Sequence, residues 1–299
     1  MTDLRLGTRG SPLALAQAAM TRAALIAAHG CAVEIVPIVT TGDRVQDRPL
    51  AEIGGKALWT KELDAALLDG RIDCAVHSMK DVETHLAAGI AIVAMLPRAD
   101  VRDRLIGADS VAALRHGAVI GTSSPRRGAQ LRHRRPDLQI VSLRGNVATR
   151  IAQLQAGAVD ATLLAAAGLD RLGLTVGTAI DDMLPAPAQG AVGITARLDD
   201  RRTTALLAAI DDHATTAAVM LERSFLARLG ATCHSSVAAL ATPQGAATRF
   251  RAEILLPDGS ECHAAAFIET TGLDDAVAAL VASLLDRASP ALRSLFSPA

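Results

Sequence analysis

The stretch RIDCAVHSMKDV, residues 71–82, joins a short apolar run to a polar cluster. The apolar residues are Cys74 to Val76, and Lys80 and Asp81 stand side by side shortly after them. This pattern is typical of a buried strand that ends at a surface, and in open α/β sheets ligands bind just outside the carboxyl ends of strands. The stretch therefore predicts an α/β fold in which an adjacent cation and carboxylate meet a ligand. A solvated Lys-Asp pair in a turn is the alternative.

Strand and helix patterns alternate around this stretch. Ser11-Pro12 suits the start of a helix, because Ser is a favoured N-cap and Pro a favoured first helical residue. We expect strands at 4–8, 33–39 and 90–96, and helices at 13–28 and 60–68. This order predicts a mostly parallel sheet covered by helices.

The same pattern starts again after residue 117. Gly121-Thr122 precedes Ser124-Pro125 as Gly7-Thr8 precedes Ser11-Pro12, with a spacing that differs by one residue. We interpret this as an internal repeat of two similar α/β domains, each with a helix N-terminus at the end of a strand. The repeat continues with strands at 138–141 and 161–165 and a helix at 146–155, and a strand at 191–195 returns to the first domain.

The pattern changes from residue 215 onward. A helix is expected at 217–228, alternating runs follow at 237–241, 249–256 and 262–270, and a last helix is expected at 274–286. The turn signal Pro257-Asp258-Gly259 separates two of the runs. This segment predicts a small C-terminal α+β domain with an antiparallel sheet. We therefore expect three domains, formed by residues 1–97 with 191–212, 98–190, and 213–299.

The composition limits the possible partners. The 299 residues are 50% hydrophobic and carry a formal net charge of -1, which indicates neither a nucleic-acid nor a membrane-surface binder. Aromatic residues make up 2%, too few for base-stacking platforms. No apolar run approaches the roughly 20 residues of a membrane span. Asp3 and Arg5 interrupt an export-signal pattern, so we expect the four scattered cysteines to be free thiols in the cytoplasm.

Arginines gather where strands of the second repeat are followed by helices. A helix N-terminus favours anions through its free N–H groups and its dipole, and Arg adds a bidentate fork suited to carboxylate. For Arg126, Arg127, Arg144 and Arg150 we favour a polyanionic ligand over a solvated face, and Arg9 holds the matching place in the first repeat. The solvated face is our interpretation for the arginines further along the helix, Arg132, Arg134 and Arg135.

Cys233 and Lys56 are two further candidates. Cys233 lies in a short loop among small residues, where a buried structural cysteine is the usual explanation. The adjacent His234 would point to the opposite side of an extended chain, which disfavours a Cys-His nucleophile pair. Lys56 follows Gly54-Gly55, but the full Walker pattern is absent, so a nucleotide is not expected.

These motifs, taken together, resemble the porphobilinogen deaminase family. The matching stretches occur in the family's order and span nearly the whole chain, and HSMKDV is a specific one. They are TRGSPLA (8–14), GGK (54–56), VHSMKDV (76–82), GTSS (121–124), RR (126–127), SLRGN (142–146), TR (149–150), AGL (167–169), RLG (171–173) and QGAVG (189–193).

The resemblance implies two lobes like those of periplasmic binding proteins and a third domain that carries a cofactor. The family builds a dipyrromethane cofactor from its own substrate and tethers it by a thioether to a loop cysteine, which Cys233 matches. The implied reaction is the stepwise condensation of four porphobilinogen molecules, with loss of ammonia, to hydroxymethylbilane. We expect a cytoplasmic monomer that acts on this small molecule and binds no nucleic acid, membrane or metal.

The same resemblance assigns roles to individual residues. Asp81 would stabilise the positive charge that develops on a pyrrole when ammonia leaves, and could assist proton transfer. The carboxylates of the cofactor would be held by Ser11, Lys80, Thr122, Ser124, Arg126 and Arg127. The incoming substrate would be held by Arg9, Arg144 and Arg150, with Lys56, Arg171 and Gln189 near the same cleft.

The chain departs from the family pattern around the cysteine. Ala231-Thr232-Cys233-His234 stands where the family usually has Gly-Gly-Cys-Gln, and glycines allow backbone conformations that Ala and Thr resist. Pro125 replaces the usual Leu, a mild change because Pro fits the first turn of a helix. There are two alternatives to the enzyme. One is a two-lobed binding protein without catalysis, and the other is a nucleic-acid binder that uses residues 126–135. The intact Asp81 and Cys233 favour the enzyme.

Overall fold

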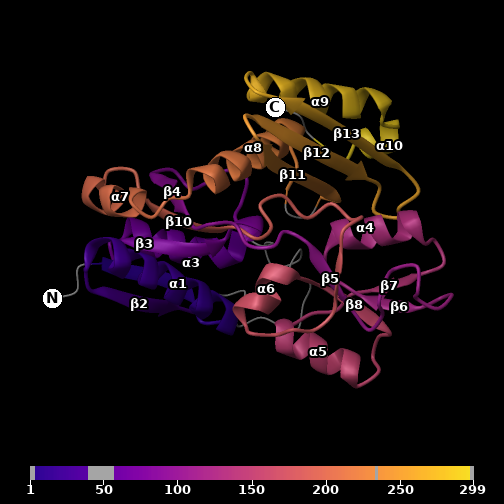
Figure 1. Ribbon diagram of the computed structural model, residues 1–299, viewed down its shortest axis with the longest axis horizontal. Helices are drawn as coiled ribbons and strands as arrows, with labels where there is room; N and C mark the ends of the chain where they lie inside the picture. The colour runs from indigo at the N-terminus through magenta and orange to yellow at the C-terminus, as the bar shows by residue number, and fades with distance from the viewer. Residues whose placement is uncertain (1–3, 40–56, 233–234, 297–299) are drawn as a thin grey trace. The chain divides into compact units, whose positions relative to one another are not determined.

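The computed structural model describes residues 4–39, 57–232 and 235–296. The chain forms two compact units, one from Met1–Ala99 with Gly190–Ala217 and the other from Asp100–Gln189 with Ala218–Ala299. Figure 1 shows the helices and strands in chain order. The chain therefore leaves the first unit after Ala99, returns at Gly190 and enters the second unit again within a helix.

The first unit is built on a five-stranded sheet of order β2-β1-β3-β10-β4. β1 is parallel to both β2 and β3, whereas β10 is antiparallel to β3 and β4. The strands are β1 (Leu4–Arg9), β2 (Val33–Ile38), β3 (Cys74–Ser78), β4 (Ile90–Met95) and β10 (Val192–Arg197). The helices packed against them are α1 (Pro12–His29), α3 (Ala57–Leu68) and α7 (Arg201–Ala208).

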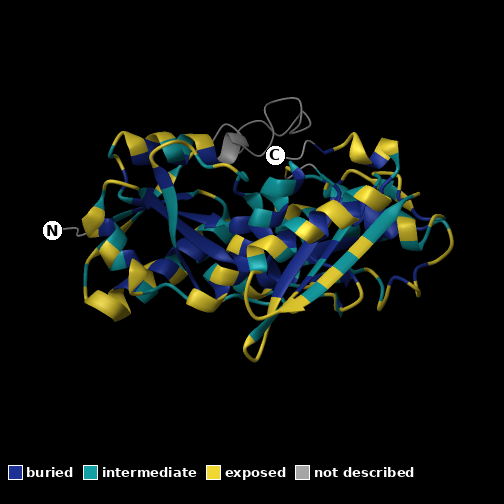
Figure 2. Ribbon diagram, turned by 90° about the horizontal axis from the view of Figure 1, so that it is seen from above, coloured by how far each residue is buried: buried dark blue, intermediate teal, exposed yellow. Residues whose placement is uncertain are grey.

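Both faces of this sheet are covered, and the side chains of β3 alternate between them. Cys74 and Val76 pack into a cluster with residues of α1 and α7, and Ala75 packs into another with residues of α3. Figure 2 shows the strands mostly in the dark blue of buried residues and the outer sides of the helices in yellow. This burial explains why β3 reads as an apolar run in the sequence.

Helix α1 begins and ends where the sequence predicts. Ser11 is the N-cap and Pro12 the first helical residue, and Gly30 ends the helix in the left-handed conformation at φ 64°. A residue with a side chain would be strained at that φ value, which is why Gly is favoured there.

The second unit contains a five-stranded sheet of order β7-β6-β8-β5-β9. β6 is parallel to β7 and β8, whereas β5 is antiparallel to β8 and β9. The strands are β5 (Asp103–Ile106), β6 (Val119–Gly121), β7 (Gln139–Val141), β8 (Ala161–Ala165) and β9 (Thr178–Ile180), and the helices are α4 (Pro125–Arg134), α5 (Val147–Gln155) and α6 (Ala166–Arg171).

The two sheets share one topology, which confirms the predicted internal repeat. In the first sheet β1 lies between β2 and β3, and in the second sheet β6 lies between β7 and β8. In each sheet an antiparallel strand lies on the other side of β3 or β8. That antiparallel strand is β10 in the first sheet and β5 in the second, and each comes directly after the chain crosses between the units. The α/β fold with two similar sheets is confirmed, but β5 and β9 were not predicted.

The C-terminal part forms a three-stranded antiparallel sheet of order β11-β12-β13. Its elements are α8 (His213–Leu229), β11 (Val237–Gln244), β12 (Ala247–Leu255), β13 (Cys262–Glu269), α9 (Leu273–Arg287) and α10 (Pro290–Arg293). Phe250 of β12 is fully buried, with ring centroids 5.7 Å from Phe225 and 5.3 Å from Phe267. The predicted α+β segment is confirmed.

The boundaries of the three predicted domains stay a prediction, because residues 98–190 and the C-terminal segment fall largely within one compact unit. Among the described residues, no helix is long and apolar enough to span a bilayer.

Candidate active site

The carboxyl end of β1 carries two of the predicted ligand-binding residues. Arg9 is the last residue of the strand and is half-buried, and Ser11 is the N-cap of α1. The backbone N–H of Ala14 donates to Ser11 Oγ at 3.3 Å. A hydroxyl that accepts from a backbone N–H keeps its own proton for another acceptor, so Ser11 can donate to an anion at the positive end of the helix dipole.

Lys80 and Asp81 lie at the same edge of the sheet, directly after β3. They belong to a single 3-10 turn, η2 (Met79–Asp81), and both are half-buried. Because β3 is the parallel neighbour of β1, its carboxyl end lies beside the one that carries Arg9 and Ser11. The prediction that a buried strand ends in this cation and carboxylate is confirmed.

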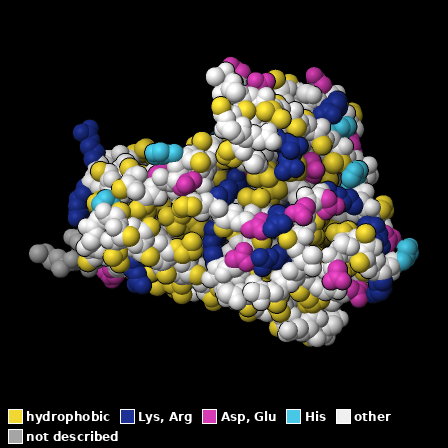
Figure 3. All heavy atoms as spheres, in the orientation of Figure 1, with side chains coloured by type: hydrophobic (Ala, Val, Ile, Leu, Met, Phe, Trp, Pro, Cys, Tyr) yellow, Lys and Arg dark blue, Asp and Glu magenta, His cyan; other side chains and the backbone are white. Residues whose placement is uncertain are grey.

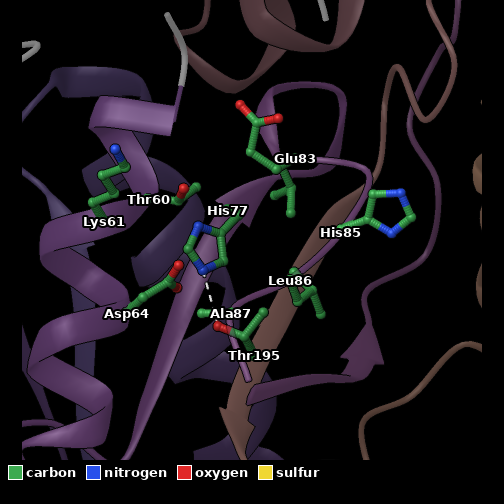
Figure 4. Close-up of a pocket in the computed structure, with 10 residues that line it drawn as sticks. Thr60, Lys61, Asp64, His77, Glu83, His85, Leu86, Ala87 and Thr195 are labelled. Atoms are coloured by element: carbon green, nitrogen blue, oxygen red, sulfur yellow. Dashed lines mark hydrogen bonds between the residues drawn. The ribbon is translucent and has the colours of Figure 1, made fainter. Parts of the chain in front are cut away.

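A cavity of about 180 Å³ adjoins this turn, and Figure 4 shows the side chains that line it. They include Asp64 of α3, His77 of β3 and Thr195 of β10. Burial raises the pKa of Asp64 to about 6. Burial and the charge of Arg9 lower the pKa of His77 to about 4, so its ring is neutral at pH 7. The sequence reasoning did not single out Asp64, His77 or Thr195.

In the second unit, Thr122 and Ser124 lie between β6 and α4. Ser124 is the N-cap of α4, and its Oγ accepts from the backbone N–H of Arg127 at 3.4 Å. Thr122 is buried, and its Oγ1 accepts from the backbone N–H of Ser124 at 3.2 Å. Both hydroxyls keep a proton to donate, as Ser11 does in the first unit.

Arg126 and Arg127 are buried and share one carboxylate, that of Asp103. Arg126 Nη2 lies 2.7 Å from Asp103 Oδ2, and Arg127 Nη2 lies 2.6 Å from Oδ1. Arg126 also donates to the carbonyl oxygen of Leu184, and Arg127 to that of Leu163. The sequence interpretation placed both guanidinium groups directly against a ligand, but their Nη atoms are bound within the fold.

Asp103 is a functional candidate that the sequence reasoning missed. Burial alone would raise the pKa of this carboxyl, but the two guanidinium groups hold it far below its usual range. Gln189 Nε2 also donates to Asp103 Oδ1 and to the carbonyl oxygen of Val101, at 2.8 Å each. The available signal was the charged run at 102–104 ahead of an apolar strand, but nothing local showed which charge would be buried.

Arg126 and Arg127 carry two positive charges and Asp103 one negative charge, an excess of one that the charge of Glu253, which acts on Arg126, partly offsets. The Nε atoms of Arg126 and Arg127 are buried and have no hydrogen-bond partner among the described residues. The cluster, defined as Asp103, Arg126, Arg127 and Gln189, therefore provides a positive field beneath the N-terminus of α4.

The predicted substrate-binding arginines follow the neighbouring strands. Arg144 lies between β7 and α5, and Arg150 lies in α5, where its Nε donates to the carbonyl oxygen of Gly145 at 3.0 Å. Asn146 is the N-cap of α5. Arg171 ends α6, and burial lowers its pKa. Because β6, β7 and β8 are parallel, α4, α5 and α6 all begin at one edge of the sheet.

The interpretation of Arg132, Arg134 and Arg135 as a solvated face is wrong. Arg132 donates to the carbonyl oxygen of Pro257 and Arg134 to that of Asp182. Arg135 forms an ion pair with Asp137 at 2.7 Å. These arginines are half-buried and are held in contacts within the fold.

Basic and acidic side chains lie next to one another on the face seen in Figure 3. Basic and acidic side chains of the second unit form ion pairs such as Arg104–Asp170 and Arg115–Asp160. Lys56 and Cys233 lie outside the described residues. Within the described ranges, no group of three or more His, Cys, Asp or Glu could hold a metal ion.

Sequence comparisons show which family the chain resembles. Residues 4–205 match the family model "Porphobilinogen deaminase, dipyromethane cofactor binding domain", and residues 216–283 match "Porphobilinogen deaminase, C-terminal domain". A porphobilinogen deaminase of Sphingopyxis alaskensis is 57% identical, over 98% of this chain and 96% of that protein. One of Paracoccus denitrificans is 54% identical, over 88% of this chain and 87% of that protein.

Solved structures give a weaker likeness. A periplasmic substrate-binding protein of an ABC transporter from Coxiella burnetii aligns with 72% of this chain and 94% of its own, at 18% identity and a TM-score of 0.42. A likeness of this size supports no argument about ligands.

Proposed function

The chain belongs to the porphobilinogen deaminase family, and from this premise we propose how its own residues carry the family's reaction. It is a hydroxymethylbilane synthase of tetrapyrrole biosynthesis, a transferase that condenses four porphobilinogen molecules with release of ammonia. The observation that carries this conclusion is the match over residues 4–205, in which the Lys80-Asp81 pair stands at a sheet edge.

The dipyrromethane cofactor, when bound, supplies the primer to which the pyrroles are joined. Its acetate and propionate groups make it a polyanion, and the donors at the sheet edges suit such a group. Ser11, Thr122 and Ser124 each carry a hydroxyl proton beside a helix N-terminus. We assign them, with Lys80, to its carboxylates.

Arg126 and Arg127 would act on the cofactor through their charge. Their Nη atoms are committed to Asp103 and to backbone carbonyls, but the cluster keeps one excess positive charge. In a buried site such a charge attracts a carboxylate more strongly than it would in water. Gln189 would support the same cluster, because its amide is bound to Val101 and Asp103.

Asp81 would stabilise the positive charge that develops on the substrate pyrrole as ammonia leaves. A half-buried carboxylate held at a fixed place can do this without reorganising solvent. Arg9, Arg144 and Arg150 would bind the carboxylates of incoming porphobilinogen, with Arg171 and Lys56 contributing to the same attraction.

Cys233 would hold the cofactor by a thioether, since it lies in the sequence between α8 and β11 and matches the loop cysteine of the family that the sequence resembles. We also propose that the protein works as a monomer in the cytoplasm, with the three-domain division given by the sequence.

The intact mass of the purified protein tests this proposal. We expect a covalent mass increase equal to one dipyrromethane, which Cys233→Ser removes along with the turnover of porphobilinogen. Cys262→Ser is the matched control, because Cys262 is a free thiol in the same C-terminal segment. An unmodified wild-type chain that does not turn over porphobilinogen would refute the function. A modified Cys233→Ser chain would refute the attachment site alone.

A further inference from the structure

The three residues before Lys80-Asp81 are each fixed by a different contact. We call them the 77–79 anchor: His77, Ser78 and Met79. Because successive side chains of a strand point to opposite faces, His77 and Ser78 are held on opposite sides of the sheet. All of the contacts described below lie within the first compact unit.

Ser78 is tied to α1. Gln17 Nε2 donates to Ser78 Oγ at 2.8 Å, and Ser78 Oγ lies 3.2 Å from Gln17 Oε1, to which it can donate. Gln17 is 2% exposed, so this pair of hydrogen bonds is shielded from water. The contact joins the carboxyl end of β3 to the helix that follows β1.

His77 is tied to β10 on the other face. Its Nε2 lies 2.9 Å from Thr195 Oγ1, the contact drawn as a dashed line in Figure 4. His77 pairs directly with Gly193 in the antiparallel ladder, so Thr195 is its diagonal neighbour. Both side chains are buried, at 7% and 1% exposure, and the ring is neutral at pH 7. A neutral buried ring suits a structural hydrogen bond better than proton transfer to substrate.

Met79 fixes the start of the turn itself. Its backbone N–H donates to the carbonyl oxygen of Ala191, and the N–H of Val82 donates back to the carbonyl oxygen of Met79 at 3.2 Å. The Met79 sulfur fills the space beside Gly193, where a Cβ atom would come within 2.1 Å of it. The Met79 side chain is 1% exposed, so it is packed inside the unit.

We propose that His77, through its hydrogen bond to Thr195, is a positioning residue that together with Ser78 and Met79 fixes Asp81 for the reaction. This inference rests on the proposed role of Asp81. Asp81 stands two residues after a backbone held from α1, from β10 and by its own turn, so the position of its carboxylate depends on these contacts. Reacting groups misplaced by about 1 Å can lose about 100-fold in rate.

The test removes the hydroxyl that His77 contacts, at a residue of the neighbouring strand β10 that is 118 residues from His77 in sequence. Thr195→Val keeps the shape of the side chain and loses the hydroxyl. We expect kcat for porphobilinogen to fall about 10- to 100-fold, with KM changed less than about twofold and the cofactor fully loaded by intact mass. Thr195→Ser restores the hydroxyl and should return kcat to near the wild-type value.

Thr203→Val is the matched control, because Thr203 is an equally buried threonine of the same unit. Its hydroxyl donates to Asp200 and does not contact His77. It should lose stability without losing kcat. Equal losses of kcat in the Thr195→Val and Thr203→Val variants would overturn the inference, as would a Thr195→Val enzyme with normal kcat.

Asp81→Asn separates this inference from the function on which it rests. An inactive Asp81→Asn enzyme beside a fully active Thr195→Val enzyme would overturn the positioning role alone. A fully active Asp81→Asn enzyme would overturn the catalytic assignment and this inference together.

Discussion

Asp103 determines the electrostatics of the second unit at the scale of single residues. It is the counter-charge of two buried guanidinium groups, and all three side chains are almost fully excluded from water. Because the folded-state pKa of Asp103 is lowered, its stabilisation is present above its unfolded pKa of about 4 and is lost only as the pH falls through the lowered value. At any pH at which the enzyme works, the carboxylate is charged.

Asp103→Asn should therefore destabilise the protein strongly. The change leaves two guanidinium groups buried without a counter-charge, which costs about 3–5 kcal/mol when a buried ion pair is broken. Urea unfolding at pH 7.5 measures the loss. Asp181→Asn is the control, because Asp181 pairs with Arg102 but is 80% exposed, so less than about 1 kcal/mol is expected. Similar midpoints for the two variants would contradict the importance of burial at Asp103.

Asp64 has the opposite effect on stability. Its pKa is raised to about 6 by burial, so the protonated form is favoured in the folded state. The resulting stabilisation is fully present below the unfolded pKa and is lost as the pH rises through 6. Asp64→Asn should then raise the free energy of unfolding at pH 7.5, by about 1 kcal/mol after discounting for solvent at this half-buried site.

The pH dependence of that gain is the measurement that checks it. Thermal unfolding of both proteins from pH 4 to pH 8 should show the difference growing as the pH rises and nearly vanishing at pH 4. A difference that is constant across the range would show that the carboxyl of Asp64 does not titrate in this way.

At the scale of elements, the long helices and most of the strands could be predicted from the sequence, whereas the short strands β5 and β9 could not. Ser11-Pro12 and Gly30 mark both ends of α1, and the apolar run at 74–76 lies inside β3. β5 and β9 have four and three residues, and β5 begins with two charged ones. Neither strand carries a clear apolar pattern of its own, so their pairing with β8 and with each other identifies them.

The same limit applied to the candidate site. The pair Lys80-Asp81 could be predicted because its signal is local, a strand that ends in a polar cluster. Asp103 meets Arg126 and Gln189 only through the fold, across 23 and 86 residues of chain. The role of Cys233 could not be predicted from its surroundings in the sequence and rests on the family resemblance.

The N-terminus of α5 gives a prediction at this scale. Arg150→Leu should raise KM for porphobilinogen about 10- to 100-fold, the range expected when a charged hydrogen bond of about 1.5–3 kcal/mol is lost. Its half-buried side chain donates to the Gly145 carbonyl, so the thermal midpoint should fall only slightly. Steady-state kinetics and a thermal scan on the same sample separate the two effects.

Arg115→Leu is the control for α5, since Arg115 forms an exposed ion pair with Asp160 and has no proposed role in binding. A lower midpoint with unchanged KM for Arg150→Leu would show that Arg150 stabilises the fold and does not bind substrate.

At the scale of the whole molecule, the chain passes between its two compact units at Ala99–Asp100, at Gln189–Gly190 and within α8. Two of these passages lead into the antiparallel strands β5 and β10, so each sheet is completed by a segment that follows a crossing. The first sheet therefore depends on β10, which is distant in sequence from its partners β3 and β4. Gln189 and Gly190 at the second crossing are buried, whereas Ala99 and Asp100 at the first are half-buried.

Glu222 of α8 stabilises the segment before the second crossing. It is fully buried, and its carboxylate accepts from the backbone N–H of Ala188 at 2.5 Å and from that of Ala241 at 2.8 Å. Ala188 has φ 62° without being glycine, a conformation that costs about 1–2 kcal/mol. One carboxylate thus joins α8, β11 and a strained residue next to Gln189.

Glu222→Gln should destabilise the second unit by about 1–3 kcal/mol, because an amide has one accepting oxygen and leaves one buried N–H without a partner. Urea unfolding measures this loss, and Glu269→Gln at an exposed position of β13 is the control.

Ala188→Gly should in turn stabilise the wild-type protein by about 1 kcal/mol, since glycine adopts this φ without strain. If Ala188→Gly destabilises the protein, the backbone at Ala188 is not strained, and the hydrogen bond that Ala188 N–H donates to Glu222 has no strain to offset.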